Sequence, residues 1–92
     1  MSVQIRIPTV LRPYTDGNAV VTAEGATVAE VVSSLDRLHP GVGSVLLESD
    51  GSLKRFVNVF VDGENVRYLQ SLDTPVPDGA EIVILPAVAG GR

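Results

Sequence analysis

The last six residues of the chain are mostly small, so this segment could enter a narrow channel in another protein. Residues 87–92 read AVAGGR and follow an apolar run, residues 82–85, which Pro86 closes. Gly90 and Gly91 lack Cβ atoms, so they can pass through a gap that is too narrow for other residues. Fully extended, the segment from Pro86 onward spans roughly 20 Å. The residues alone leave two interpretations open, a functional thread and a frayed chain end.

The rest of the sequence offers no recognisable catalytic site. It contains one histidine and no cysteine, and it lacks the HExxH, GxSxG and GxxxxGK[ST] motifs. His39 stands beside Pro40 and Gly41, where a helix should end, and we interpret it as a capping or surface residue. We therefore predict a protein that is not an enzyme, holds no metal and binds no cofactor.

The length and the net charge of the chain limit the fold and the kinds of partner that it can have. A chain of 92 residues predicts one domain, and its 45% apolar residues favour a packed core built mainly from Val, Ile and Leu. The net charge of −4, without a basic stripe, disfavours nucleic-acid and anionic-membrane partners. Because the sequence shows neither a signal peptide nor an apolar run long enough to span a bilayer, we expect a cytoplasmic protein.

Alternating and β-branched segments predict the strands. In residues 3–7, apolar and polar side chains alternate, so Val3, Ile5 and Ile7 should face the core. Residues 9–18 are expected to form a polar loop. Residues 80–85 are almost continuously apolar, which favours a central strand covered on both faces. Further strands are expected at residues 19–23 and 55–61, with a short edge strand at residues 64–69.

The main helix is predicted to begin at Thr27. Thr27 and Glu30 have the spacing of a capping box, and residues 40–41, a Pro-Gly pair, should end the helix. An apolar stripe at three- and four-residue steps should face the sheet. It consists of Val28, Val31, Val32, Leu35 and Leu38. Residues 41–48 are ambiguous between a loop and a short helical turn.

This order of elements predicts an α+β fold, a β-grasp domain of the ubiquitin-like type. One main helix would pack on one face of a mixed four- to five-stranded sheet, with the first and last strands side by side at its centre. Phe60 would project from the other face, either as a partner-binding residue or in cross-strand packing. Residues 1–86 would form this domain, and residues 87–92 a flexible C-terminal tail.

The sequence resembles the ThiS/MoaD-like sulfur carrier proteins, ubiquitin-fold domains that end in Gly-Gly. The resemblance covers nearly the whole chain, and within the family it is strongest to the carriers of actinobacterial cysteine biosynthesis. A lone Gly-Gly would be a weak signal, but together with this order of elements it is specific. The resemblance rests on residues 7–12 (IPTVLR), 55–61 (RFVNVFV), 78–79 (DG) and 84–91 (ILPAVAGG).

The resemblance implies that sulfur is carried on the carboxyl group of Gly91. An E1-like adenylyltransferase and sulfurtransferase would adenylate this carboxylate with ATP and Mg²⁺, and a sulfide or persulfide would displace AMP to leave a thiocarboxylate. The thiocarboxylate would then attack an aminoacrylate on a PLP-dependent cysteine synthase, or another sulfur-accepting synthase would use it. A zinc metalloprotease would release the cysteine.

The same resemblance implies the residues that partners contact. Phe60 and Leu85 would form an apolar docking patch on the sheet. The tail residues that enter the channel of the partner enzyme would be Val88, Ala89, Gly90 and Gly91.

One residue departs from the family pattern. Carriers that are ready for adenylation end at the second glycine, whereas this chain ends at Arg92. We interpret Arg92 as a precursor residue that a protease removes by cutting between Gly91 and Arg92. The alternatives are a residue foreign to the native protein and a protein that does not carry sulfur.

Two other functions remain open. The chain could be a ubiquitin-like modifier that forms isopeptide bonds, which covalent adducts on target lysines would reveal. It could also be a small subunit or carrier for molybdopterin, thiamin or thiosugar biosynthesis, which stable co-purification with a synthase would reveal. The partner enzymes, and not this chain, would determine which molecule accepts the sulfur.

Overall fold

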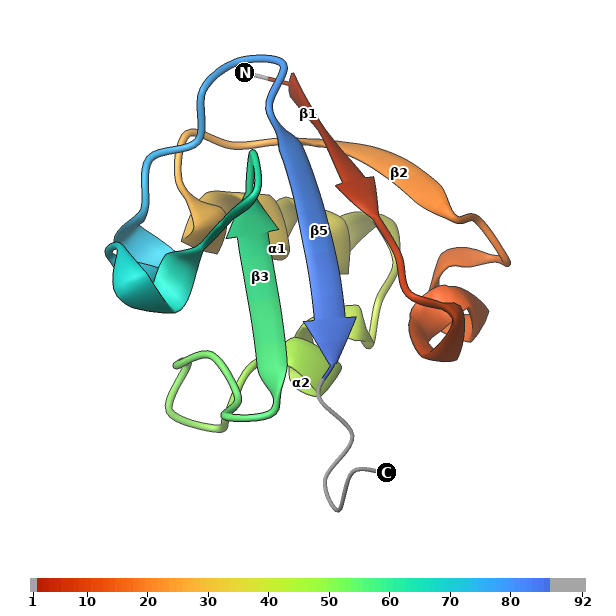
Figure 1. Ribbon diagram of the computed structural model, residues 1–92. Coiled ribbons are helices and arrows are strands. Elements are labelled where there is room, and N and C mark those ends of the chain that lie inside the picture. Colours follow the sequence, from red (N-terminus) through yellow and green to blue (C-terminus); the bar gives the residue numbers. More distant parts are fainter. Residues whose placement is uncertain (1, 87–92) are drawn as a thin grey trace.

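Within residues 2–86, which the computed structural model describes, five strands form one mixed sheet with α1 behind it (Figure 1). The strands are β1 (Ser2–Arg6), β2 (Val20–Glu24), β3 (Val57–Val61), β4 (Glu64–Asn65) and β5 (Glu81–Pro86). The helices are α1 (Val28–Leu38) and α2 (Val42–Leu46), with shorter-pitch 3-10 helices at η1 (Thr9–Thr15), η2 (Val66–Tyr68) and η3 (Ser71–Asp73).

The strand order is β2-β1-β5-β3-β4, so the last strand lies in the centre of the sheet. β5 pairs parallel with β1, where Ile5 stands opposite Ile82, and antiparallel with β3, where Val59 stands opposite Ile84. A parallel pair needs a long crossover connection, and α1 lies within that connection. The predicted α+β fold, its mixed sheet and the pairing of the first and last strands are confirmed.

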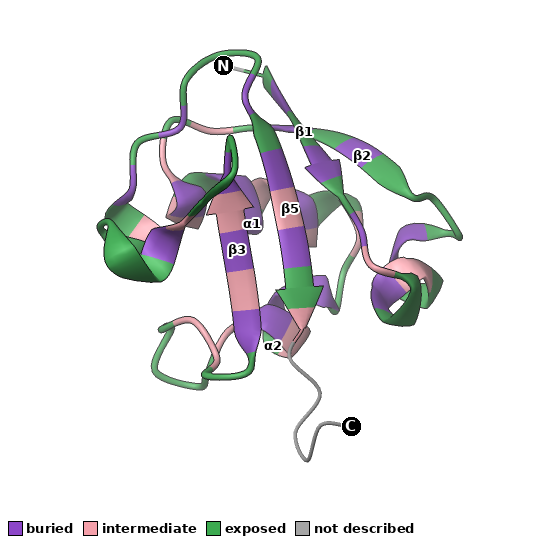
Figure 2. Cartoon of the chain, in the orientation of Figure 1, coloured by how far each residue is buried: buried purple, intermediate pink, exposed green. Residues whose placement is uncertain are grey.

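The core lies between the sheet and α1 (Figure 2). Val3, Ile5 and Ile7 are buried there, as their alternation predicts. Four members of the predicted helix stripe are also buried, but Leu38 is 57% exposed, so that part of the prediction is wrong. Leu38 is the last residue of α1, and it lines a pocket together with residues of β2.

Local hydrogen bonds define both ends of α1. At the start, the Thr27 hydroxyl accepts from the backbone N–H of Glu30 at 3.2 Å, and the Glu30 carboxylate accepts from the N–H of Ala26 at 2.8 Å. The predicted capping box is therefore present, although Glu30 reaches the residue before the cap. At the other end, the N–H of His39 donates to the carbonyl of Leu35, and the chain turns at Gly41 with a φ of 104°.

Two other segments differ from the structure expected from the sequence, and a third, which the sequence left ambiguous, is a helix. The segment expected as a polar loop contains η1, because Leu11 and Thr15 are buried against the body. The ambiguous segment after α1 forms α2, which buries Val42 and Leu46. The expected edge strand is only two residues long and passes into η2. In the part of the chain with described coordinates, no helix is both long and apolar enough to cross a membrane.

Candidate functional site

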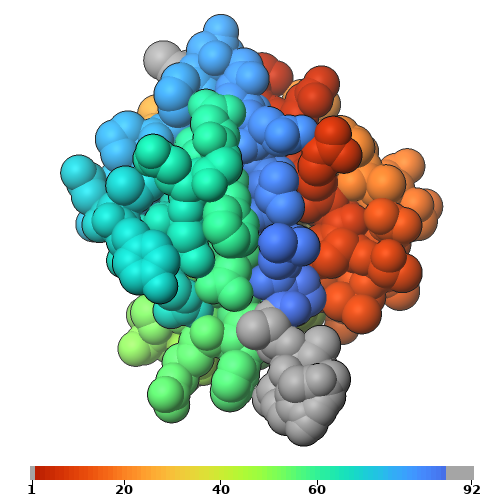
Figure 3. All heavy atoms as spheres, in the orientation of Figure 1, coloured from red at the N-terminus to blue at the C-terminus, as the bar shows by residue number. Residues whose placement is uncertain are grey.

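The end of β5 is the place from which the predicted tail would start. β5 runs down the middle of the face shown in Figure 3, between β3 and β1, and its last residue, Pro86, pairs with Val57 at the start of β3. The tail predictions, namely Val88, Ala89, Gly90, Gly91 and the processing site at Gly91 and Arg92, lie outside the described residues. The structure therefore places the last strand before the tail and not the tail itself.

The two predicted docking residues lie on the sheet face turned away from α1. Ile82 and Ile84 of β5 are buried, whereas Val83 is half-buried and Leu85 is 48% exposed. The expectation that β5 is covered on both faces is therefore wrong for residues 2–86. A continuously apolar strand also fits a sheet in which one face remains available to a partner.

Phe60 is less accessible than Leu85. The register places Phe60 opposite Val83 on one side and Asn65 on the other, and its side chain is half-buried. Leu85 stands opposite Asn58, one position diagonal to Phe60. The structure thus brings Phe60 and Leu85 to neighbouring positions on one face, with Leu85 as the more exposed of the two. We call Phe60, Val83 and Leu85 the sheet patch.

Charged residues border the sheet patch at the start of β5. Arg6 of β1 and Glu81 of β5 form an ion pair between side chains that are both largely in water. Such an exposed pair contributes only about 0–1 kcal/mol to stability. Its position gives the apolar row on β5 a polar edge at the end far from Pro86, as is typical of a binding surface with an apolar centre.

A second exposed aromatic residue lies close to the end of β5. Phe56 directly precedes β3 and is 55% exposed, and the next residue, Val57, pairs with Pro86. Sequence reasoning placed Phe56 in a strand but gave it no role. Its alternation with Phe60 was a usable signal, because residues at even spacing in a strand point to the same face.

The titratable groups in the described residues do not form an arrangement suited to catalysis. The His39 ring lies 4.0 Å from the Asp16 carboxylate, and His39 caps the end of α1. Hydrogen bonds from the Ser52 side chain and backbone lower the pKa of Asp50, which belongs to a fully exposed turn. Within residues 2–86, no group of three His, Cys, Asp or Glu residues could hold a metal ion.

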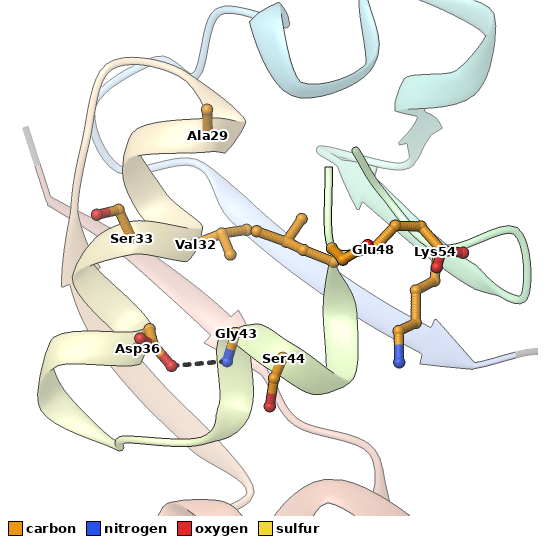
Figure 4. A pocket seen from close by; sticks show the side chains of 10 residues that line it. Ala29, Val32, Ser33, Asp36, Gly43, Ser44, Glu48 and Lys54 are labelled. Atoms are coloured by element: carbon orange, nitrogen blue, oxygen red, sulfur yellow. Dashed lines mark hydrogen bonds between the residues drawn. The ribbon is translucent and has the colours of Figure 1, made fainter. Parts of the chain in front are cut away.

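A pocket of about 640 Å³ lies between α1 and α2 (Figure 4). Its one carboxylate from α1, Asp36, accepts hydrogen bonds from the backbone N–H groups of Gly43 at 2.8 Å and Gly41 at 3.2 Å. Asp36 thus joins the two helices. Because a helix end needs such acceptors, these contacts have a structural explanation.

Comparison with known proteins places this domain among sulfur carriers. The sequence profile of the ThiS family matches residues 5–91. Sulfur carrier protein CysO of Mycobacterium tuberculosis is 45% identical over 93 residues, which cover 99% of this chain and 100% of the relative. Small archaeal modifier protein 3 of Haloferax volcanii is 38% identical over 68 residues, covering 74% of this chain and 73% of the relative.

Solved structures agree with these matches. A chain of the Amycolatopsis orientalis BexX/CysO complex superposes with a TM-score of 0.91 and 44% identity, covering 97% of this chain and 99% of that chain. On the profile match and the full-length identity to a sulfur carrier, this chain belongs to the ThiS family.

Proposed function

We propose that Gly91, exposed by removal of Arg92, carries sulfur as a C-terminal thiocarboxylate and supplies it for cysteine biosynthesis. The observation that carries this proposal is the 45% identity to sulfur carrier protein CysO over 99% of the chain. The profile match reaches Gly91 and stops before Arg92. The residue beyond the match is the one that has to be removed.

The chemistry needs only the terminal carboxylate from this chain. A carboxylate oxygen of Gly91 attacks the α-phosphate of ATP, and pyrophosphate leaves, which gives an acyl adenylate. The sulfur of sulfide then attacks the acyl carbon, and AMP leaves with the C–O bond electrons, which gives the thiocarboxylate. If an enzyme persulfide attacks instead, an acyl disulfide forms, and a second thiol of the enzyme cleaves its S–S bond, forming an enzyme disulfide and releasing the thiocarboxylate. An E1-like adenylyltransferase and sulfurtransferase provides ATP, Mg²⁺ and the sulfur donor, and a PLP-dependent cysteine synthase accepts the sulfur.

The position of β5 in the fold supports this proposal. β5 is bonded on both sides, to β1 and β3, so Pro86 has a fixed position in the body. Gly91 follows five residues later and can lie at most about 17 Å from Pro86. An enzyme that receives Gly91 must therefore cover the surface around the end of β5, and the sheet patch is the apolar part of that surface.

Removal of Arg92 is a separate step that another protein performs. In this sequence Arg92, whose side chain is long and charged, follows Gly91 and occupies its carboxyl group in a peptide bond. Hydrolysis of the peptide bond between Gly91 and Arg92 gives free arginine and the Gly91 carboxylate. We assign this step to a zinc metalloprotease, since a zinc-bound water is a suitable nucleophile for a peptide bond.

A second function is favoured by the similarity to a small archaeal modifier protein. In a modifier, the nitrogen of a target lysine attacks the activated acyl carbon of Gly91 and forms an isopeptide bond. The two functions share the adenylation step and differ in the nucleophile that follows it. Products therefore distinguish them, because the carrier gains sulfur while the modifier becomes part of a larger adduct.

The test is to incubate the chain lacking Arg92 with ATP, Mg²⁺, the E1-like enzyme and sulfide, and to measure its intact mass. We expect a gain equal to the replacement of one oxygen by sulfur, and no change in a parallel sample of the chain that retains Arg92. An unchanged mass in both samples would count against the carrier function. Adducts on lysines of an added protein extract would favour the modifier.

A further inference from the structure

Arg67 holds the segment that enters β3. One nitrogen of its guanidinium group, Nη2, donates to the backbone carbonyls of Lys54 at 2.6 Å, Arg55 at 2.7 Å and Val57 at 2.8 Å. These three carbonyls lie within one turn of four residues, 54–57, which the hydrogen bond from the N–H of Val57 to the carbonyl of Lys54 closes. Arg67 therefore determines the path of the backbone through Phe56.

Arg67 is itself fixed in place. Its Nε lies 3.4 Å from the Asn58 side-chain oxygen, and its backbone N–H donates to the Asn65 side chain at 3.0 Å. Asn65 in turn donates to the same Asn58 oxygen at 3.3 Å. The network connects β3, β4 and η2. A lysine could not make the same contacts as Arg67, because a single ammonium group lacks the planar set of donors that reaches both the carbonyls and the Asn58 side chain.

The segment that Arg67 holds presents an aromatic side chain next to the end of β5. Phe56 stands between the Arg55 and Val57 carbonyls that Arg67 binds, and more than half of its side chain is exposed. An aromatic side chain on a fixed backbone loses little conformational entropy when a partner covers it. Exposed, preorganised aromatic residues of this kind are the ones that contribute most to binding energy in interfaces.

The position of Phe56 indicates which partner would cover it. Phe56 is adjacent to Val57, the residue that pairs with Pro86, and Gly91 lies within about 17 Å of Pro86. An activating enzyme that encloses Gly91 has to lie against this end of β3. Its complementary feature is an apolar recess next to the entrance of the channel that receives the tail.

We propose that Phe56 contacts the activating enzyme and that Arg67 is a positioning residue that acts through Phe56. The inference rests on the proposed function and adds a surface at the entry to β3 to the sheet patch. It also assigns a role to Arg67, which binds three backbone carbonyls at the entry to β3. Arg67 influences activation by holding the Phe56 backbone and has no direct contact with the reacting carboxylate.

The first test measures adenylation of the chain lacking Arg92 through pyrophosphate release, at varied carrier concentration. Phe56→Ala is expected to raise the KM for the carrier about tenfold. The kcat should stay within about twofold, because the variant still delivers the same carboxylate. Phe56→Leu should restore most of the affinity. The matched control is Tyr68→Ala, which removes an 86% exposed aromatic ring next to Arg67 and should leave both constants unchanged.

The second test asks whether Arg67 acts through Phe56. Arg67→Lys should raise KM while kcat stays the same, and the double variant Arg67→Lys/Phe56→Ala should be no worse than Phe56→Ala alone. A purely structural Arg67 would lower the Tm but leave the KM of the folded protein unchanged. Effects of the two substitutions that multiply would likewise overturn the positioning role.

The outcomes also separate this inference from the function on which it rests. If the parent chain lacking Arg92 is not adenylated, both are overturned. If the parent is adenylated and Phe56→Ala has an unchanged KM, only the contact at Phe56 is overturned. Because Phe56 is exposed and precedes β3, this variant should fold, so the result does not depend on the fate of the Arg67 variants.

Discussion

Gly90→Val in the chain lacking Arg92 is expected to lower the rate of adenylation by at least about 100-fold, because a misplacement of about 1 Å at a reacting group can already cost that much. A valine side chain would widen the peptide next to the carboxylate that must enter the enzyme. Its branched Cβ also removes backbone angles that glycine can adopt. Initial rates of pyrophosphate release measure the effect.

Ala87→Val is the matched control for this prediction. It places the same valine side chain in the same peptide, three residues earlier in the sequence. We expect its rate to stay within about tenfold of the parent, because it is farther from the reacting carbon. Equal losses for the two variants would show that bulk anywhere in the peptide is harmful, and an unaffected Gly90→Val would contradict a narrow channel at Gly90.

Leu85→Glu is expected to raise the KM for the activating enzyme between about 10- and 100-fold, because a carboxylate would then have to be desolvated where an apolar side chain was buried. Leu85 is 48% exposed in the isolated domain, so the free energy of unfolding should change by no more than about 1 kcal/mol. Urea denaturation and steady-state kinetics together separate the two effects.

The control for Leu85→Glu is Leu38→Glu. Leu38 is a leucine of similar exposure, 57%, but it ends α1 on the other side of the sheet. The KM of the activating enzyme for the Leu38→Glu variant should equal that for the parent chain. Leu85 is a sharper probe than Phe60, since Phe60 is half-buried between Val83 and Asn65 and its substitution would also reduce stability. A KM that rises equally for Leu38→Glu and Leu85→Glu would contradict a docking role for the sheet patch.

The elements that short-range patterns determine could be predicted from the sequence. Alternation in residues 3–7 located β1 and its buried face, and the Thr27 and Glu30 pair located the start of α1. The order of elements was enough to place β1 beside β5, because a β-grasp sheet joins its first and last strands at the centre. The family membership agrees with the resemblance stated from the sequence.

Features that depend on contacts between distant segments could not be predicted in this way. A continuous apolar run does not reveal whether one or both faces of a strand are covered, so the exposure of Leu85 had to come from the structure. The helical period likewise does not reveal which residues of an apolar stripe the core covers, which is why Leu38 was predicted to face the sheet although it is 57% exposed. The hydrogen bonds of Arg67 to carbonyl groups leave no sequence signature, since any residue supplies a carbonyl.

Part of the candidate site could be predicted from the sequence, and part of it depends on contacts that only the structure shows. The sheet patch at Phe60 and Leu85 was inferred from resemblance, and the structure places both residues on one face near the end of β5. The role proposed for Phe56 rests on hydrogen bonds from Arg67 to the backbone carbonyls on either side of it, which only the structure reveals. The residues that would carry the chemistry, Gly90 and Gly91, follow from the composition of the chain end and from the family.

The most direct test of the carrier function is the intact mass of this protein purified from its native cells under conditions that preserve thiocarboxylates. The account predicts a population that ends at Gly91, of which part has one oxygen replaced by sulfur. Addition of an alkylating reagent should shift that part alone, because only the thiocarboxylate has a reactive sulfur and the chain contains no cysteine. Arg92 retained in every molecule, with no gain of sulfur, would contradict the account.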